Sequence, residues 1–139
     1  MVETDFKKLK HFTLQETKTA GGIVEGINFE SYKKLDKFRD LLGREVNLIH
    51  NGINSGKHNA PEHKSGNAFD FWVKGIAENK DWHEIVYKLF NAGFTGVGVY
   101  YNHKTERYSF HAHSGRYGTW FGFKGYYSDP WTYKNLFFA

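Results

Sequence analysis

Two short segments in this chain, residues 67–73 and 107–113, have the period of two that is typical of a β-strand: the first places Phe69, Phe71 and Val73 on one face, and the second alternates polar and apolar side chains. In the first segment Asp70 falls on the face opposite these apolar residues, together with Ala68 and Trp72. In the second segment His111 and His113 are two residues apart, so both point to one face. If the two segments are neighbouring strands, this pattern brings a carboxylate and two imidazoles to one side of a sheet.

A further imidazole, that of His63, precedes the first of these strands by a few residues. The chain has to turn between His63 and Asp70, and Gly66 is the residue that permits such a turn. Histidine and aspartate are zinc ligands, and a catalytic zinc site needs three protein ligands with one open position. The sequence therefore predicts a zinc site built from His63, Asp70 and one or both histidines of the later strand.

The remaining pattern predicts an α+β fold: an antiparallel sheet with two main helices packed against it, in a single domain over residues 1–139. One helix is expected over residues 29–42, where apolar positions have helical spacing and Gly43 follows as the C-terminal cap. The second helix is expected over residues 81–90. Residues 1–28 are predicted to be an irregular N-terminal arm, and the aromatic tail from Tyr117 is expected to pack over the sheet. Further strands are expected over residues 45–50 and 94–101, with a long loop over residues 51–66.

The composition narrows the chemistry further. The 139 residues include no cysteine, so disulfides, thiolate ligands and a cysteine nucleophile are excluded. The net charge of +4 comes from scattered basic residues, which weakens the case for nucleic acid as the partner. A basic surface also suits an anionic polymer such as bacterial cell wall, although the charge by itself indicates no more than a solvated surface. No stretch has the roughly 20 apolar residues that span a membrane. The N-terminus has no apolar signal core, which predicts a protein made in the cytoplasm, without membrane association.

The run His63-x-x-Gly66-x-Ala68-x-Asp70 resembles the HxxGxAxD motif of the zinc D-Ala-D-Ala carboxypeptidases and related murein endopeptidases, which share their fold with the hedgehog signalling domain. The resemblance continues in the helix over residues 29–42, in the segment 46–52 and in Gly96-Val97-Gly98-Val99-Tyr100. It ends with the block from Phe110 to Arg116 and with Trp120.

This resemblance implies that His63 and Asp70 are zinc ligands. The third ligand is open: members with an HxH pair use the second histidine, which selects His113, whereas members with HxD before Gly-Arg and a Trp use the first, which selects His111. The spacing to Trp120 favours His111. The other histidine would then act beside the metal as an acid, a base or a hydrogen-bond donor.

The chain departs from the family at two positions. The family's general base is an acidic residue shortly before the third ligand; here the nearest is Glu106, on the wrong face of a regular strand, so the base is expected to be Glu106 or the remaining histidine, His113. In the loop after the first strand, Asn54 stands where the family often has a substrate-binding Arg. Asn54, Ser55 and Arg116 are the expected substrate-binding residues.

Together these features predict a monomeric zinc peptidase that hydrolyses the stem peptides of peptidoglycan, as a carboxypeptidase or a phage-type endolysin. A phage lysis or particle route would then release it to the cell wall. The alternative is a zinc-containing binding module of the same fold that recognises cell wall or a protein partner without hydrolysis. Nucleic-acid binding through the basic and aromatic surface is the third alternative, and it requires no metal.

Overall fold

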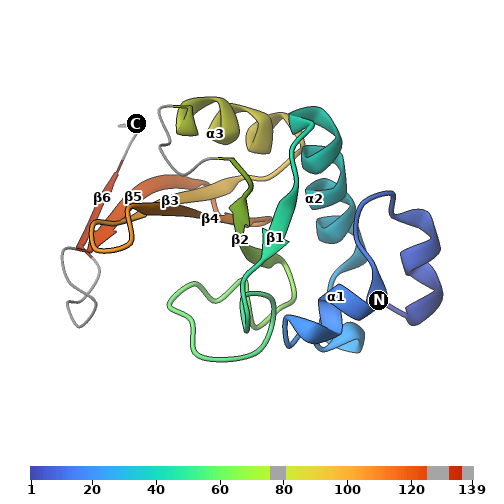
Figure 1. Ribbon diagram of the computed structural model, residues 1–139. Helices are drawn as coiled ribbons and strands as arrows, with labels where there is room; N and C mark the ends of the chain where they lie inside the picture. Colours follow the sequence, from blue (N-terminus) through green and yellow to red (C-terminus); the bar gives the residue numbers. More distant parts are fainter. Residues whose placement is uncertain (76–80, 125–131, 136–139) are drawn as a thin grey trace.

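The computed structural model describes residues 1–75, 81–124 and 132–135 and has an α+β architecture around one six-stranded sheet (Figure 1). The strands lie in the order β1-β2-β4-β3-β5-β6. All neighbouring strands are antiparallel except β3 and β5, which are parallel. The α+β class is therefore confirmed, whereas the prediction of a purely antiparallel sheet is wrong. The strands are β1 (Val46–Leu48), β2 (Ala68–Val73), β3 (Gly96–Asn102), β4 (Arg107–His113), β5 (Gly118–Lys124) and β6 (Thr132–Asn135).

The mixed sheet follows from where β5 pairs. The chain reverses direction between β4 and β5, but β5 pairs with β3 on the side away from β4. Because β3 is antiparallel to β4, a strand that runs back and pairs with β3 has to be parallel to it. The part of the aromatic tail over residues 118–124 therefore joins the sheet instead of packing over it. The segments 125–131 and 136–139 of that tail lie outside the described residues.

The two main helices form where the apolar spacing predicts them. Helix α2 (Phe29–Leu42) begins after Asn28, whose side chain accepts a hydrogen bond from the backbone N–H of Ser31. It ends at Gly43, which has a left-handed conformation with φ of 71°. Helix α3 (Trp82–Asn91) begins one residue later than expected. The predicted helix over residues 29–42 is thus confirmed in its bounds.

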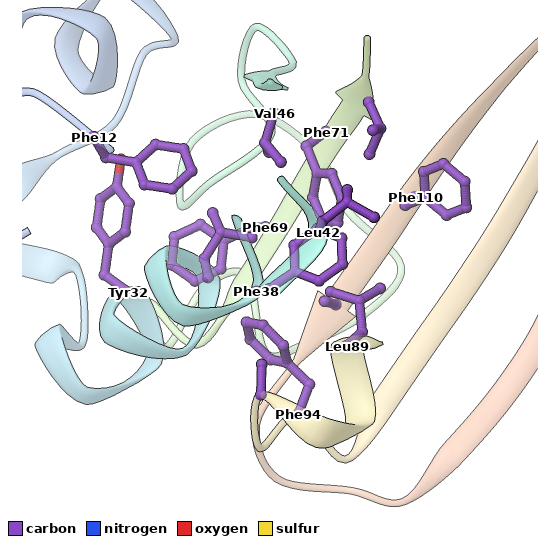
Figure 2. Packing of buried hydrophobic residues seen from close by; sticks show 14 of the residues in the cluster. Phe12, Tyr32, Phe38, Leu42, Val46, Phe69, Phe71, Leu89, Phe94 and Phe110 are labelled. Carbon is purple, nitrogen blue, oxygen red and sulfur yellow. The ribbon is translucent and has the colours of Figure 1, made fainter. Parts of the chain in front are cut away.

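One face of the sheet packs against these helices. The side chains of α2 and α3 meet those of β2, β3 and β4 in a core that is rich in phenylalanine, as Figure 2 shows. Phe69 and Phe71 of β2 are completely buried there, as the alternation predicts. Asp70, His111 and His113 consequently point to the opposite face of the sheet. The core includes Tyr32, Leu35 and Phe38 of α2, Ile85 and Leu89 of α3, and Val97, Val99 and Phe110 of β3 and β4.

The N-terminal region is helical instead of an irregular arm. It contains the 3-10 helices η1 (Glu3–Lys8) and η2 (Val24–Gly26) and the short helix α1 (Leu14–Thr19). Phe6 and Phe12 are buried with their ring centroids 5.9 and 5.3 Å from that of Tyr32. Helices of three to six residues are too short to show an apolar period, so the sequence pattern missed them. None of the helices in the described part of the chain has the length and apolar character needed to cross a membrane.

Candidate metal centre

Strand pairing places the predicted ligands in one row across the open face of the sheet. Asp70 of β2 lies directly opposite His111 of β4, which lies opposite Gly98 of β3. His113 lies opposite Gly96 in the next row. A Cβ added to Gly96 would come 1.8 Å from Nε2 of His113. Glycine at this position therefore leaves the space that the imidazole of His113 occupies over β3.

His63 reaches this row from the loop that precedes β2. Gly66 turns the chain with φ of 76°, and its carbonyl accepts a hydrogen bond from the N–H of Asn28 at 2.9 Å. The carbonyl of Ile53 accepts a hydrogen bond from Nδ1 of His63 at 2.6 Å. These contacts direct Nε2 of His63 toward Asp70 and His111.

Three possible ligand atoms form a tight triangle. Nε2 of His63 lies 3.3 Å from Oδ1 of Asp70 and 3.1 Å from Nδ1 of His111, and the latter two atoms are 2.9 Å apart. Ligand atoms at about 2.05 Å from one tetrahedral zinc ion lie about 3.3 Å from each other. The two imidazole planes meet at 64°, which lets both rings point toward a single ion. The spacing therefore suits one small metal ion.

The hydrogen bonds around the histidines leave lone pairs at the centre of the triangle. A carbonyl can only accept, so His63 donates from Nδ1 to Ile53, and Nε2 of the neutral ring carries the lone pair. In the same way His113 donates from Nε2 to the carbonyl of Arg116 at 3.1 Å. Nδ1 of His113 then accepts from Nε2 of His111 at 2.7 Å, which leaves the lone pair of His111 on Nδ1.

Two imidazole lone pairs and a carboxylate oxygen thus converge within 3.3 Å. Three acceptors at this distance repel one another unless a cation lies between them. In the metal-free protein, a proton on His63 supplies part of the positive charge that these three acceptors require. Burial lowers the pKa of His63, but the hydrogen bond and charge of Asp70 outweigh it and raise that pKa above its usual value.

The surroundings of the other two members of the triangle favour the ionised carboxylate of Asp70 and the neutral imidazole of His111. Burial raises the pKa of Asp70, but its close contacts with the imidazoles of His111 and His63 outweigh the effect of burial and hold that pKa well below the usual range. Burial lowers the pKa of His111. Neutral histidine and ionised aspartate are the forms that bind a metal.

A cavity of about 360 Å³ opens over the triangle. His63 and His111 are each 2% exposed, whereas the side chain of Asp70 is 25% exposed toward this space. A ligand in the cavity can therefore approach a metal ion held by the triangle from one side. The cavity is lined by Ile49, Lys57, His58, Asn59, Ala60, Tyr100, Ser109 and Phe110 together with His63, Asp70 and His111.

His58 is a neighbour that the sequence did not single out. His58, His63 and Asp70 form a group that could hold a metal ion, and Nδ1 of His58 lies 3.6 Å from Oδ2 of Asp70. However, the ring of His58 stacks on that of His63 at 3.6 Å and 17°. Two parallel rings cannot both point at one ion, so His58 would have to rotate to bind with His63. As arranged, His111 completes the triangle better than His58.

His113 lies behind the triangle instead of in the cavity. It is 1% exposed, and both its ring nitrogens are hydrogen-bonded. Its position therefore suits an outer residue that fixes the orientation of His111. The second predicted proton acceptor, Glu106, is exposed in the turn between β3 and β4, at the far end of β4 from His111. The structure does not bring Glu106 to the cluster.

The predicted substrate-binding residues are occupied by structural contacts. Asn54 accepts from the N–H of Ile23 at 2.9 Å and donates to its carbonyl at 2.8 Å. Ser55 donates to the carbonyl of Gly21 at 2.8 Å. Both therefore hold the loop against the N-terminal region. Arg116 is placed to support the centre, because its carbonyl accepts from His113.

The guanidinium of Arg116 is also engaged. It forms a two-pronged pair with Glu62, which is 7% exposed and lies 3.7 Å from Nε2 of His113. The hydrogen bond from Arg116 lowers the pKa of Glu62 to about 2. The pair therefore carries little net charge behind His113, and Arg116 acts as a supporting residue in this arrangement.

We expect the metal-free protein to lose stability between about pH 6.5 and pH 4 because of His113. Burial and the neighbouring His111 lower the pKa of His113 from 6.5 to about 4. In this range the unfolded chain binds a proton that the folded chain does not, so the free energy of unfolding falls as pH falls. Urea unfolding of chelator-treated protein across this range measures the slope. His113→Asn, which cannot titrate, should flatten it, and an unaltered slope would contradict the expectation.

No known protein family, curated protein or solved structure matches the chain in the comparisons made. The chain is therefore defined by its own features: an α+β fold with a mixed sheet and a candidate metal centre on the open face of that sheet.

Proposed function

We propose that this chain is a zinc-dependent peptidase that hydrolyses amide bonds in the stem peptides of peptidoglycan. The observation that carries the proposal is the convergence of two imidazole lone pairs and a carboxylate beneath an open cavity. The resemblance of His63-x-x-Gly66-x-Ala68-x-Asp70 to the motif of the zinc D-Ala-D-Ala peptidases supports the choice of metal and of substrate.

In this proposal His63, Asp70 and His111 hold the ion. Zinc in such a site supplies a Lewis acid that polarises the scissile carbonyl and activates water. His113 keeps His111 in the tautomer that exposes Nδ1, and the carbonyl of Arg116 keeps His113 in its own tautomer. The imidazole of His58 and the phenol of Tyr100 also line the cavity.

Lys57 supplies a positive charge to the same cavity. It is exposed at the edge of the space that contains the triangle. Stem peptides carry carboxylate groups, so an ammonium at this edge complements their charge. We therefore assign to Lys57 the role in substrate binding that Asn54 does not serve.

The second candidate function is a zinc-containing binding module that recognises cell wall or a protein without hydrolysis. The observation that favours it is the absence of both predicted proton acceptors from the described lining of the cavity. Glu106 is exposed in a distant turn, and both nitrogens of His113 are already hydrogen-bonded behind the triangle. The two functions share the metal and differ only in turnover.

Metal analysis combined with digestion of purified muropeptides tests the proposal. We expect one zinc ion per chain and cleavage that stops on chelation and returns with zinc. His63→Ala should lose both zinc and cleavage, whereas His83→Ala, which alters an exposed histidine of α3, should retain both. Bound zinc without cleavage would leave the binding module. A folded chain that takes up no zinc would contradict both functions.

A further inference from the structure

A second cavity lies beside the metal centre, between helix α1 and strand β1. Its volume is about 690 Å³, which is within the range of about 300–1,000 Å³ that is typical of ligand sites. Leu48 and His50 line this second cavity, whereas Ile49 between them lines the cavity over the triangle. The segment 48–50 is therefore a wall that the two cavities share. A long ligand of the metal centre would meet the second cavity next.

The indole of Trp72 supplies a flat apolar surface to the second cavity. Trp72 is 41% exposed and lies on β2 two residues from Asp70, on the same face of the sheet and about 7 Å along the strand. The guanidinium of Arg107, from β4 on the other side of β2, lies 5.9 Å from the centroid of the indole. Cation–π attraction of this kind favours one orientation of the ring. The metal centre thus has a held, exposed aromatic ring beside it.

The rest of this lining is polar but has no positively charged side chain. None of the described residues that line the second cavity is lysine or arginine, and Glu16 is the acidic residue among them. The indole N–H of Trp72 and the side chains of Asn47 and His50 form no hydrogen bond with another described residue. Asn47 lies directly opposite Trp72 on β1. Several hydrogen-bonding groups therefore surround the indole and are open to a ligand.

This combination suits a neutral ligand that has a flat apolar face and many hydroxyl or amide groups, as a sugar ring does. The C–H face of the ring would stack on Trp72, and its hydroxyl and acetamido groups would bond with Asn47 and His50. A polymer of carboxylates or phosphates would meet the carboxylate of Glu16 and no cation in this lining. An apolar peptide segment would cover the polar groups without pairing them, which is costly.

We infer that the second cavity binds the glycan strand of peptidoglycan, with one sugar ring stacked on Trp72. This inference rests on the proposed function, and it extends the recognised substrate from the stem peptide to the sugars that carry it. The stem peptide is joined directly to the glycan strand, so a peptide bound at the triangle brings sugar rings close to it. The shared wall at residues 48–50 puts a sugar site and a peptide site next to each other.

Binding of a tetrasaccharide of N-acetylglucosamine to the full-length chain tests the inference without any need for turnover. We expect binding by calorimetry that is equal in zinc-loaded and chelator-treated protein, because the sugar site contains none of the three metal ligands. Trp72→Ala should weaken this binding about tenfold or more, and Trp72→Phe should weaken it less because an aromatic face remains. Asn47→Ala, which leaves the indole in place, should weaken it severalfold. The matched control is Tyr87→Ala, which removes a 67% exposed aromatic ring from α3 and should leave the affinity unchanged.

The contrary outcomes each overturn the inference. A wild-type chain that binds no tetrasaccharide would show that the cavity does not accept sugars. Unchanged affinity in Trp72→Ala and Asn47→Ala, or an equal loss in Tyr87→Ala, would place the sugar elsewhere. Binding that requires zinc would place the sugar at the metal centre. Muropeptide cleavage judges the peptidase separately: sugar binding without cleavage overturns the peptidase and retains the sugar site, whereas cleavage without sugar binding does the reverse.

Discussion

Replacing His111 with alanine is expected to lower zinc affinity roughly a thousandfold, whereas replacing His113 should lower it only about ten- to a hundredfold. His111 directs a lone pair into the triangle. A binding free energy of about 10–16 kcal/mol shared by four ligands is about 2.5–4 kcal/mol for each, and the upper value corresponds to about a thousandfold in affinity. His113 only donates and accepts hydrogen bonds behind His111. Loss of such an outer partner has the smaller effect.

Competition with a chromophoric chelator measures both affinities on one scale. His83→Ala serves as the control, since His83 is exposed on α3. Circular dichroism should show that each variant is folded before the comparison is made. A larger loss in His113→Ala than in His111→Ala would reverse the assignment and make His113 the ligand.

Replacing Gly66 with alanine is expected to destabilise the protein by about 2–5 kcal/mol. The left-handed conformation of Gly66 is strained for any residue with a Cβ, which costs about 1–2 kcal/mol. A Cβ there would also come 1.9 Å from the carbonyl oxygen of Gly26, and that backbone atom has little freedom to retreat. Overpacking of this kind adds about 1–3 kcal/mol.

Gly43 is a matched control because its φ of 71° is close to the 76° of Gly66, but nothing lies within 4 Å of an added Cβ. Gly43→Ala should therefore cost only about 1 kcal/mol, from backbone strain alone. Urea unfolding of both variants measures the difference. Equal destabilisation would show that the contact with Gly26 relaxes freely and that the close approach has no energetic weight.

The sequence was sufficient to predict those elements whose side chains repeat with the period of a helix or of a strand. Apolar spacing predicted α2, and alternation predicted which residues of β2 and β4 face the core. The grouping of Asp70 with His111 follows from the same alternation, once the two strands pair. These features depend on residues close in sequence or on one strand pairing, so a pattern of side chains is enough to predict them.

The parts that the sequence missed depend on long-range contacts. Nothing in residues 118–124 indicates which strand they pair with, and so the parallel pairing of β3 and β5 could not be predicted. Asn54 was assigned to substrate by its position in a motif, but its amide is used by Ile23. His58 lines the cavity because of the conformation of its loop. Tyr100 lines the cavity and accepts a hydrogen bond from Nε1 of Trp120. Neither feature has a sequence signature.

The bonds that join the loop over residues 51–58 to the N-terminal region also set how far the chain can be shortened. Asn51 donates from its N–H to the carbonyl of Ala20 at 2.8 Å, and Ser55 and Asn54 bind the next residues of that region. The carbonyls of Asn51 and Ser55 in turn contact the ring of His58 at the wall of the cavity. A version beginning at α2 would keep the triangle's own residues and lose the support of one wall. Residues 1–28 therefore belong to the scaffold of the site, although none of them lines its cavity.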